Sequence, residues 1–215
     1  MSFELWLAFV AASAVLLVLP GPTILTVISY AIAHGRRVQL PLVAAVALGD
    51  CTALVLSLVG LGAVLAASAF WFTVVKWAGG LYLVYLGLKL LRAAAAAAPE
   101  TQAAAPAAEP VPPASRWKLF ANTYLVTALN PKGIVFFVAF LPQFVSRDAG
   151  AAQQLWLLAS TFVVLATLNA FAYAAFAGQA RRLLASPRAQ RGFHLTGGSL
   201  LCGAGLWALL AKRPA

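Results

Sequence analysis

The sequence predicts an all-α integral membrane protein with six transmembrane helices, arranged as a 3+3 inverted repeat in which helices one and four are interrupted at proline motifs. Three observations lead to this class. Of the 215 residues, 63% are hydrophobic and only 9% are charged, whereas soluble domains carry roughly 25% charged residues. Six apolar runs each reach the roughly 20 residues that cross a bilayer. Glycine and proline motifs also recur at matching places in the two halves.

The first half of the chain, residues 1–92, supplies three predicted helices. The first covers residues 5–33 and is broken by Pro20-Gly21-Pro22, because proline removes a helix hydrogen bond. A signal peptide would begin with positive charge and have a shorter apolar region, so we expect this helix to be retained. The next two helices are predicted over residues 38–66 and 70–91, joined by a very short link.

The second half, residues 116–215, follows a segment of different composition. Residues 93–115 are rich in alanine and proline and lack the apolar periodicity of a packed element, so we expect a flexible linker there. Three further helices are then predicted over residues 119–145, 155–176 and 193–211. The first of them is interrupted near its middle at Asn130-Pro131.

The Lys and Arg side chains predict the orientation in the membrane. If the N-terminus lies outside, most of the fifteen basic residues fall on the cytoplasmic side. Positive charge accumulates in cytoplasmic loops, so we expect both termini outside and the linker in the cytoplasm. The residues on that side are Arg36, Arg37, Lys89, Arg92, Arg116, Lys118, Arg181, Arg182, Arg188 and Arg191.

Matched glycines support the internal repeat. Helix three carries Gly79-Gly80 followed by Gly87, and helix six carries Gly197-Gly198 followed by Gly205 at the same spacing. Because each half has an odd number of crossings, such a repeat must be inverted, which is a common architecture of secondary transporters. The alternative is that glycine and proline are simply frequent in membrane helices. Faces of small residues permit close helix packing and are also compatible with a homodimer.

Asp50 and Lys132 form the sharpest chemical signal. Both lie within apolar segments that start on the cytoplasmic side, at similar distances from the basic residues that precede them. With a rise of about 1.5 Å per residue, both reach roughly the middle of the membrane. Charges at that depth are costly unless they pair or line a wet cavity. They form either a structural ion pair or a site in which Asp50 takes a cation and Lys132, with helix N-termini, takes a carboxylate.

Other residues give weaker signals. Asn130 and Asn169 could bind a ligand or bond between helices, and the same holds for Thr167. Together with the two proline breaks, the candidate substrate-binding and coupling residues are Pro20, Gly21, Pro22, Asp50, Asn130, Pro131, Lys132 and Asn169. Cys51 and Cys202 fall in apolar runs and form no metal-ligand cluster, so we expect neither a metal nor a cofactor. The net charge of +10 follows membrane topology and does not indicate nucleic-acid binding.

Taken together, these motifs resemble the LysE/RhtB family of bacterial amino-acid exporters over essentially the whole chain apart from the linker. No single motif is specific, but their order is. The resemblance is carried by Pro20-Gly21-Pro22, Gly35-Arg36-Arg37, Gly49-Asp50, Lys76-Trp77-Ala78-Gly79-Gly80, Asn130-Pro131-Lys132 and Phe140-Leu141-Pro142-Gln143-Phe144.

This resemblance implies a secondary transporter, not an enzyme, that exports amino acids or close derivatives from the cytoplasm across the bacterial inner membrane. It also implies coupling to the proton motive force. The partners would then be an amino-acid substrate, protons and the lipid bilayer. The residues themselves point in the same direction, because balanced charges at mid-membrane suit a zwitterion bound between helices one and four.

Three other functional classes are alternatives to an amino-acid exporter. An exporter of small cations would normally need clustered His, Cys or carboxylate ligands, and Asp50 is the only acid at mid-membrane depth. A membrane-embedded enzyme needs a nucleophile with a base or a metal, and both histidines fall near predicted helix ends. A purely structural membrane subunit would give no functional reason for the charges of Asp50 and Lys132 or for the two helix breaks.

Overall fold

The computed structural model describes residues 1–67, 69–96, 115–145 and 150–210, and every regular element in these ranges is a helix. The predicted linker lies largely outside the described residues. In chain order the elements are α1 (Phe3–Val18), α2 (Pro22–His34), a 3-10 turn (Gly35–Val38), α3 (Gln39–Ala67), α4 (Ala69–Ala96), α5 (Arg116–Ala128), α6 (Pro131–Val135), a π-helical turn (Phe136–Phe140), a 3-10 turn (Leu141–Phe144), α7 (Ala151–Ala175), α8 (Ala177–Ala185) and α9 (Pro187–Leu210).

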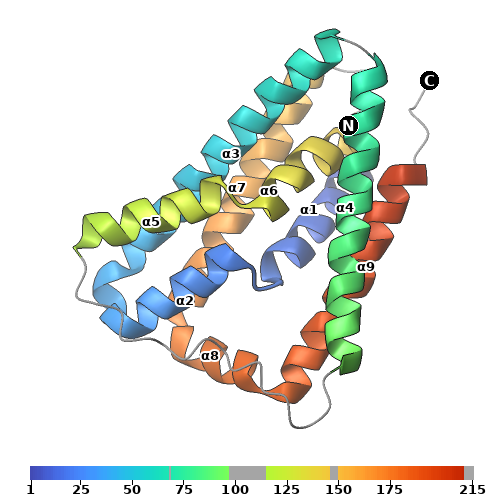
Figure 1. Ribbon diagram of the computed structural model, residues 1–215. Helices are drawn as coiled ribbons and strands as arrows, with labels where there is room; N and C mark the ends of the chain where they lie inside the picture. Colours follow the sequence, from blue (N-terminus) through green and yellow to red (C-terminus); the bar gives the residue numbers. More distant parts are fainter. Residues whose placement is uncertain (68, 97–114, 146–149, 211–215) are drawn as a thin grey trace.

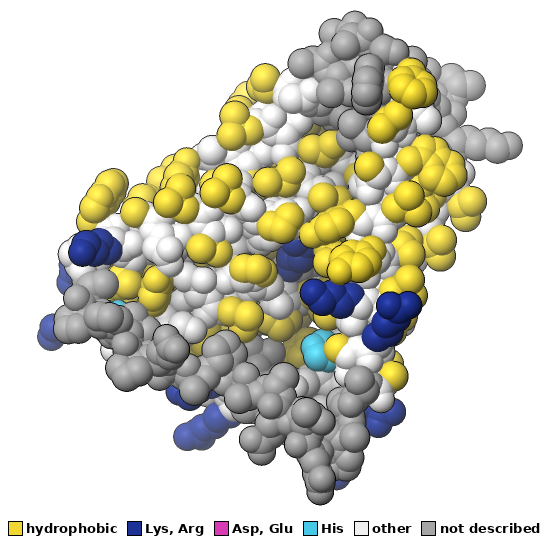
Figure 2. Space-filling view, in the orientation of Figure 1, with side chains coloured by type: hydrophobic (Ala, Val, Ile, Leu, Met, Phe, Trp, Pro, Cys, Tyr) yellow, Lys and Arg dark blue, Asp and Glu magenta, His cyan; other side chains and the backbone are white. Residues whose placement is uncertain are grey.

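Four helical stretches among the described residues are long and apolar enough to cross a membrane. They are Pro22–Gly60, Trp77–Ala95, Arg116–Phe144 and Ala151–Ala175, and the apolar helix α1 is shorter. Large apolar side chains on these stretches are exposed, for example Val59 and Leu168. The space-filling view shows such side chains spread over the outer surface, with Lys and Arg gathered toward its lower end (Figure 2). A multi-pass membrane protein is the class that fits an apolar exterior of this kind.

The helices enclose the two interrupted segments. Helix α3 packs against α5 and α7 on one side, and α4 packs against α9 on the other (Figure 1). Between these groups lie α1, α2 and α6, and α8 crosses one end of the bundle from α7 to α9. Two proline breaks that are far apart in the sequence are thereby placed in the centre of the molecule.

Both predicted interruptions are present. Helix α1 ends at Val18 and α2 begins at Pro22, with Gly21 as an N-cap that provides no side-chain bond. Helix α5 ends at Ala128 and α6 begins at Pro131. Proline fits the first position of a helix because the amide it lacks would have no partner there, so both breaks restart a helix.

Helices α4 and α9 meet through the glycines that match between the two halves. A Cβ added to Gly80 would lie 3.2 Å from the carbonyl oxygen of Gly205, and one added to Gly87 would lie 2.7 Å from that of Gly198. The reciprocal contacts are equally tight, at 2.7 Å from Gly205 to Gly80 and 2.8 Å from Gly198 to Gly87. The backbones are therefore too close for a side chain at any of these four glycine positions. These glycine faces are buried within one chain, so they are not a free surface for a homodimer.

The structure adds elements that the apolar runs did not indicate. The segment after α6 continues as a π-helical turn and then a 3-10 turn, in which Phe136, Phe140 and Phe144 pack together. Helix α8 precedes α9, which begins at Pro187, earlier than the predicted start. Phenylalanines of both turns face α1, where Phe9 contacts Phe136 of the π-helical turn and Phe144 of the 3-10 turn.

Candidate functional site

Two cavities meet at the helix breaks. The larger has a volume of about 660 Å³, and the smaller has about 40 Å³. Both are lined by Gly21, Asn130 and Lys132, so one residue of the first break and two of the second form the boundary between them. The volume of the larger cavity falls in the range of small-molecule sites.

The structure brings all eight predicted site residues to these cavities. Pro20, Pro22 and Pro131 line the larger one, and Asp50 and Asn169 line the smaller one. Thr167 lines neither of these two cavities, and its hydroxyl group donates to the carbonyl oxygen of Val163 in its own helix. Asp50 and Lys132, for which the sequence predicted similar depths in the membrane, thus line one cavity.

Lys132 caps the end of α1. Its ammonium group donates hydrogen bonds to the carbonyl oxygens of Leu16 and Leu19, each at 2.9 Å. The last four carbonyls of a helix have no partner within that helix, and its C-terminus carries partial negative charge. A half-buried cation at this place therefore both satisfies two carbonyls and is stabilised by the helix that it caps.

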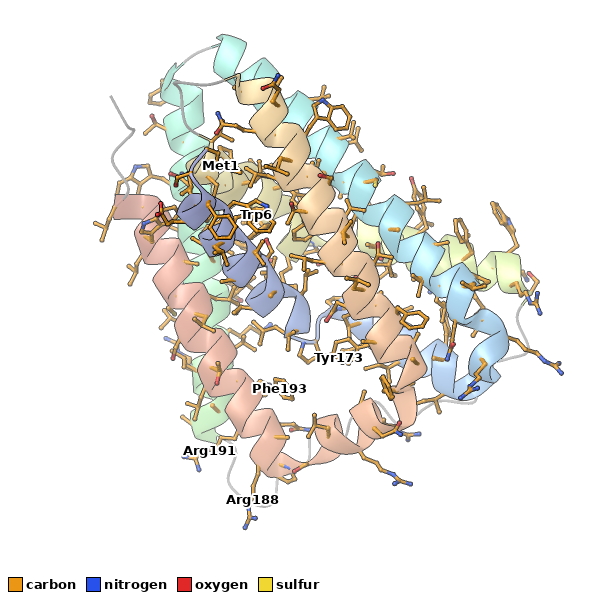
Figure 3. The ribbon with its side chains drawn as sticks, turned by 180° about the vertical axis from the view of Figure 1, so that it is seen from behind. Met1, Trp6, Tyr173, Arg188, Arg191 and Phe193 are labelled. Carbon is orange, nitrogen blue, oxygen red and sulfur yellow. The ribbon has the colours of Figure 1, made fainter. Side chains whose placement is uncertain are left out.

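Helix α7 satisfies the remaining two carbonyls. The side-chain amide of Asn169 donates to the carbonyl oxygen of Leu17 at 3.0 Å, and the hydroxyl of Tyr173 donates to that of Val18 at 2.8 Å. Figure 3 shows Tyr173 on α7 beside the α1–α2 break. Each orphan carbonyl at the end of α1 thus has a side-chain donor, and all the donors come from the second half of the chain.

Asn130 joins the two breaks directly. Its side-chain oxygen accepts from the backbone amide of Lys132 at 3.1 Å, which caps α6. Its side-chain amide donates to the hydroxyl of Thr23, in the first turn of α2, at 3.1 Å. One residue therefore fixes the start of α6 and holds it against the start of α2.

Gly21 gives Lys132 room at the break. A Cβ added to Gly21 would lie 3.2 Å from the Lys132 nitrogen, which is a tight contact. The glycine thus allows the ammonium group to approach the backbone at the end of α1.

Asp50 lies close to this group without forming an ion pair. Its side chain is 9% exposed and lines the smaller cavity with Lys132. Within the described part of the chain, no hydrogen bond or ion pair within 4.0 Å engages its carboxylate, although it interacts electrostatically with Lys132. The two charges therefore face one cavity with Lys132 bound to α1, which differs from a closed ion pair between α3 and α6.

Tyr173 and Thr23 were not indicated by the sequence. Both contact the breaks through single hydrogen bonds, and Tyr173 binds a backbone oxygen. The acceptor is the backbone carbonyl of Val18, which no side chain of α1 indicates. Tyr173 follows Asn169 by four residues, so both lie on one face of α7, and this spacing could have indicated the tyrosine.

Comparison with known proteins identifies the family of this chain. The family model described as LysE type translocator matches residues 14–212. The chain is 32% identical over 212 residues to the homoserine/homoserine lactone efflux protein of Salmonella typhimurium (strain LT2), covering 99% of this chain and 98% of that protein.

Two further relatives differ in how much of the chain they cover. An uncharacterized membrane protein of Vibrio cholerae is 31% identical and covers 99% of this chain and 100% of its own. The leucine efflux protein of Klebsiella pneumoniae is 29% identical over 67% of this chain and 65% of its own. No solved structure gives a significant match. By the family match over nearly its whole length, this chain belongs to the family of LysE type translocators.

Proposed function

We propose that the protein is a secondary transporter that exports amino acids or close derivatives from the cytoplasm across the inner membrane, by proton-coupled alternating access between two three-helix halves. The observation that carries this proposal is the convergence of both helix breaks, Asp50 and Lys132 on two adjoining cavities. Efflux is also the activity in the names of the Salmonella and Klebsiella relatives.

In this proposal the substrate binds at the boundary between the cavities. An ammonium group has three N–H donors, and the Lys132 side chain uses two of them on α1. The third N–H donates to the substrate carboxylate, and so do the free backbone amides at the start of α2. The Asp50 carboxylate takes the substrate ammonium or the coupling proton, because it has no nearer partner within the described residues.

The contacts between α4 and α9 support the inverted repeat. If the halves are exchanged so that Gly80 replaces Gly198 and Gly87 replaces Gly205, the Gly80–Gly205 contact becomes the Gly198–Gly87 contact. Both contacts occur, as a two-fold axis between the halves requires. Such an axis in the membrane plane is the symmetry with which transporters exchange inward-open and outward-open states.

A second large cavity supplies the other side of the pathway. It has a volume of about 490 Å³ and lies between α1, α9 and the aromatic turn that contains Phe136 and Phe140. It shares Leu201 with the cavity of about 660 Å³ and Leu16 with the smaller one. With the linker in the cytoplasm, the cavity of about 660 Å³, lined by Lys89 and Arg181, is the cytoplasmic part of the pathway. Movement of α1 against α9 would then connect the helix breaks to the outside.

The experiment is amino-acid efflux from cells loaded with dipeptides, compared with cells that lack the protein. We expect efflux in the wild type, its loss on adding a protonophore, and a loss of at least tenfold in Asp50→Asn. Glu4→Gln is the matched control, since Glu4 is an exposed acid at the start of α1. Undiminished efflux in Asp50→Asn protein that inserts normally would contradict the mechanism.

A small-cation exporter is one alternative to this proposal. Among the described residues, no group of three or more His, Cys, Asp and Glu side chains could hold a metal ion. Metal-dependent protection of growth by the protein, without amino-acid efflux, would favour this alternative.

A further inference from the structure

The lining of the cavity of about 660 Å³ is positively charged. Its lining residues include Lys89, Lys132, Arg181 and His194. No Asp or Glu is among the described residues that line it. Asp50 lies in the adjoining small cavity. Among the described residues, a molecule that moves through this cavity toward the helix breaks therefore passes only positive or neutral groups before it reaches Asp50.

Two of these cations are separate from the central site. Lys89 is an exposed residue of α4, and Arg181 is an exposed residue of α8. Neither has an acidic partner within 4.0 Å in the described part of the chain. They reach the cavity from different elements, so their positive potential acts across its width.

Most of the other lining residues of this cavity are apolar, among them Leu25, Ile28, Leu86, Leu90 and Phe193. Ser29, Tyr82 and Gln190 are its uncharged polar lining residues besides Asn130. In Figure 3 Phe193 points from α9 toward the interior of the bundle, whereas Arg188 and Arg191 point away from the bundle. An apolar side chain of a substrate gains free energy against such a lining, and a charged one loses part of its hydration there.

We infer that the cavity selects neutral amino acids with apolar side chains and rejects cationic ones, with Lys89 and Arg181 as the residues that set this charge selectivity. A zwitterion carries no net charge, and its carboxylate is attracted by the basic lining. A cationic amino acid carries a net positive charge past Lys89 and Arg181, and no acid among the described lining residues of this cavity offsets that repulsion. This inference rests on the proposed export function.

The test measures efflux of leucine, lysine and glutamate separately in cells loaded with the matching dipeptides. In the wild type, we expect leucine efflux to exceed lysine efflux by at least tenfold. In Lys89→Gln/Arg181→Gln, we expect this ratio to fall by roughly threefold to tenfold because lysine efflux rises, since two like charges that repel the cationic substrate are removed. The single variants should each give a smaller change.

The control is Arg188→Gln/Arg191→Gln, which removes two exposed arginines at the same end that point away from the cavity. We expect the leucine-to-lysine ratio to stay unchanged in this variant. Equal efflux of lysine and leucine by the wild type, or an unchanged ratio in Lys89→Gln/Arg181→Gln, would overturn the inference. Glutamate efflux above that of leucine would overturn the apolar preference. Absence of efflux for all three would instead contradict the proposed function.

Discussion

The ammonium group of Lys132 lies 2.9 Å from the carbonyl oxygens of both Leu16 and Leu19, so a cation from the second half of the chain caps a helix of the first half. Asn169 and Tyr173 complete this cap on Leu17 and Val18. In a membrane protein such carbonyls cannot turn to bulk water, so the cap ties the α1–α2 break to α6 and α7.

Lys132→Met is expected to lower the stability of the protein and to remove its export activity. Two buried carbonyls lose their donors, and each unsatisfied group costs about 1–3 kcal/mol. Thermal unfolding in detergent and amino-acid efflux measure the two effects. Lys118→Met is the matched control because Lys118 is exposed in the first turn of α5. A Lys132→Met protein with wild-type stability would show that the cap contributes nothing.

Tyr173→Phe removes one hydroxyl group and leaves the ring in place. The carbonyl of Val18 then loses its donor, and we expect a loss of about 1–2 kcal/mol in stability with a several-fold decrease in efflux. Tyr85→Phe is the control, since that tyrosine is 57% exposed on α4. Equal melting temperatures for the two variants would argue against a role for the Tyr173 hydroxyl.

Gly198→Ala tests the close contact of α4 with α9. The new methyl group would lie 2.8 Å from the carbonyl oxygen of Gly87 and 2.7 Å from a side-chain carbon of Leu91, so the helices must separate. Overpacking of this kind costs typically 1–3 kcal/mol. Gly203→Ala, on the same helix, is the control because nothing lies within 4 Å of its added Cβ. Thermal unfolding should separate the two variants, and equal melting temperatures would contradict the contact.

The sequence was sufficient to locate the helix breaks and the residues around them. Proline removes a backbone donor wherever it occurs, so Pro20-Gly21-Pro22 and Asn130-Pro131 had to interrupt their helices. The positions of Asp50 and Lys132 along their apolar segments also predicted that the two charges lie at a similar depth in the membrane, and both line one cavity. The partners of Lys132 could not be predicted, because its acceptors are backbone oxygens of leucine residues. The π-helical turn was equally hidden, since Phe136–Phe140 is apolar on every face.

Exchanging the two central charges, in Asp50→Lys/Lys132→Asp, distinguishes a capping lysine from a simple ion pair. A simple pair keeps its attraction when its members are exchanged. Here an aspartate at position 132 would put a second negative group beside the carbonyls of Leu16 and Leu19, where the helix end is already negative. We therefore expect the exchanged protein to be less stable than Asp50→Asn and to show no efflux.

The matched measurement is the amount of each variant in the membrane, followed by thermal unfolding in detergent. Lys132→Arg keeps a positive charge at the end of α1 and should keep more of the stability than the exchanged protein does. Recovery of wild-type stability by the exchange would mean that attraction to Asp50, and not the capping of α1, is what holds Lys132 in the membrane.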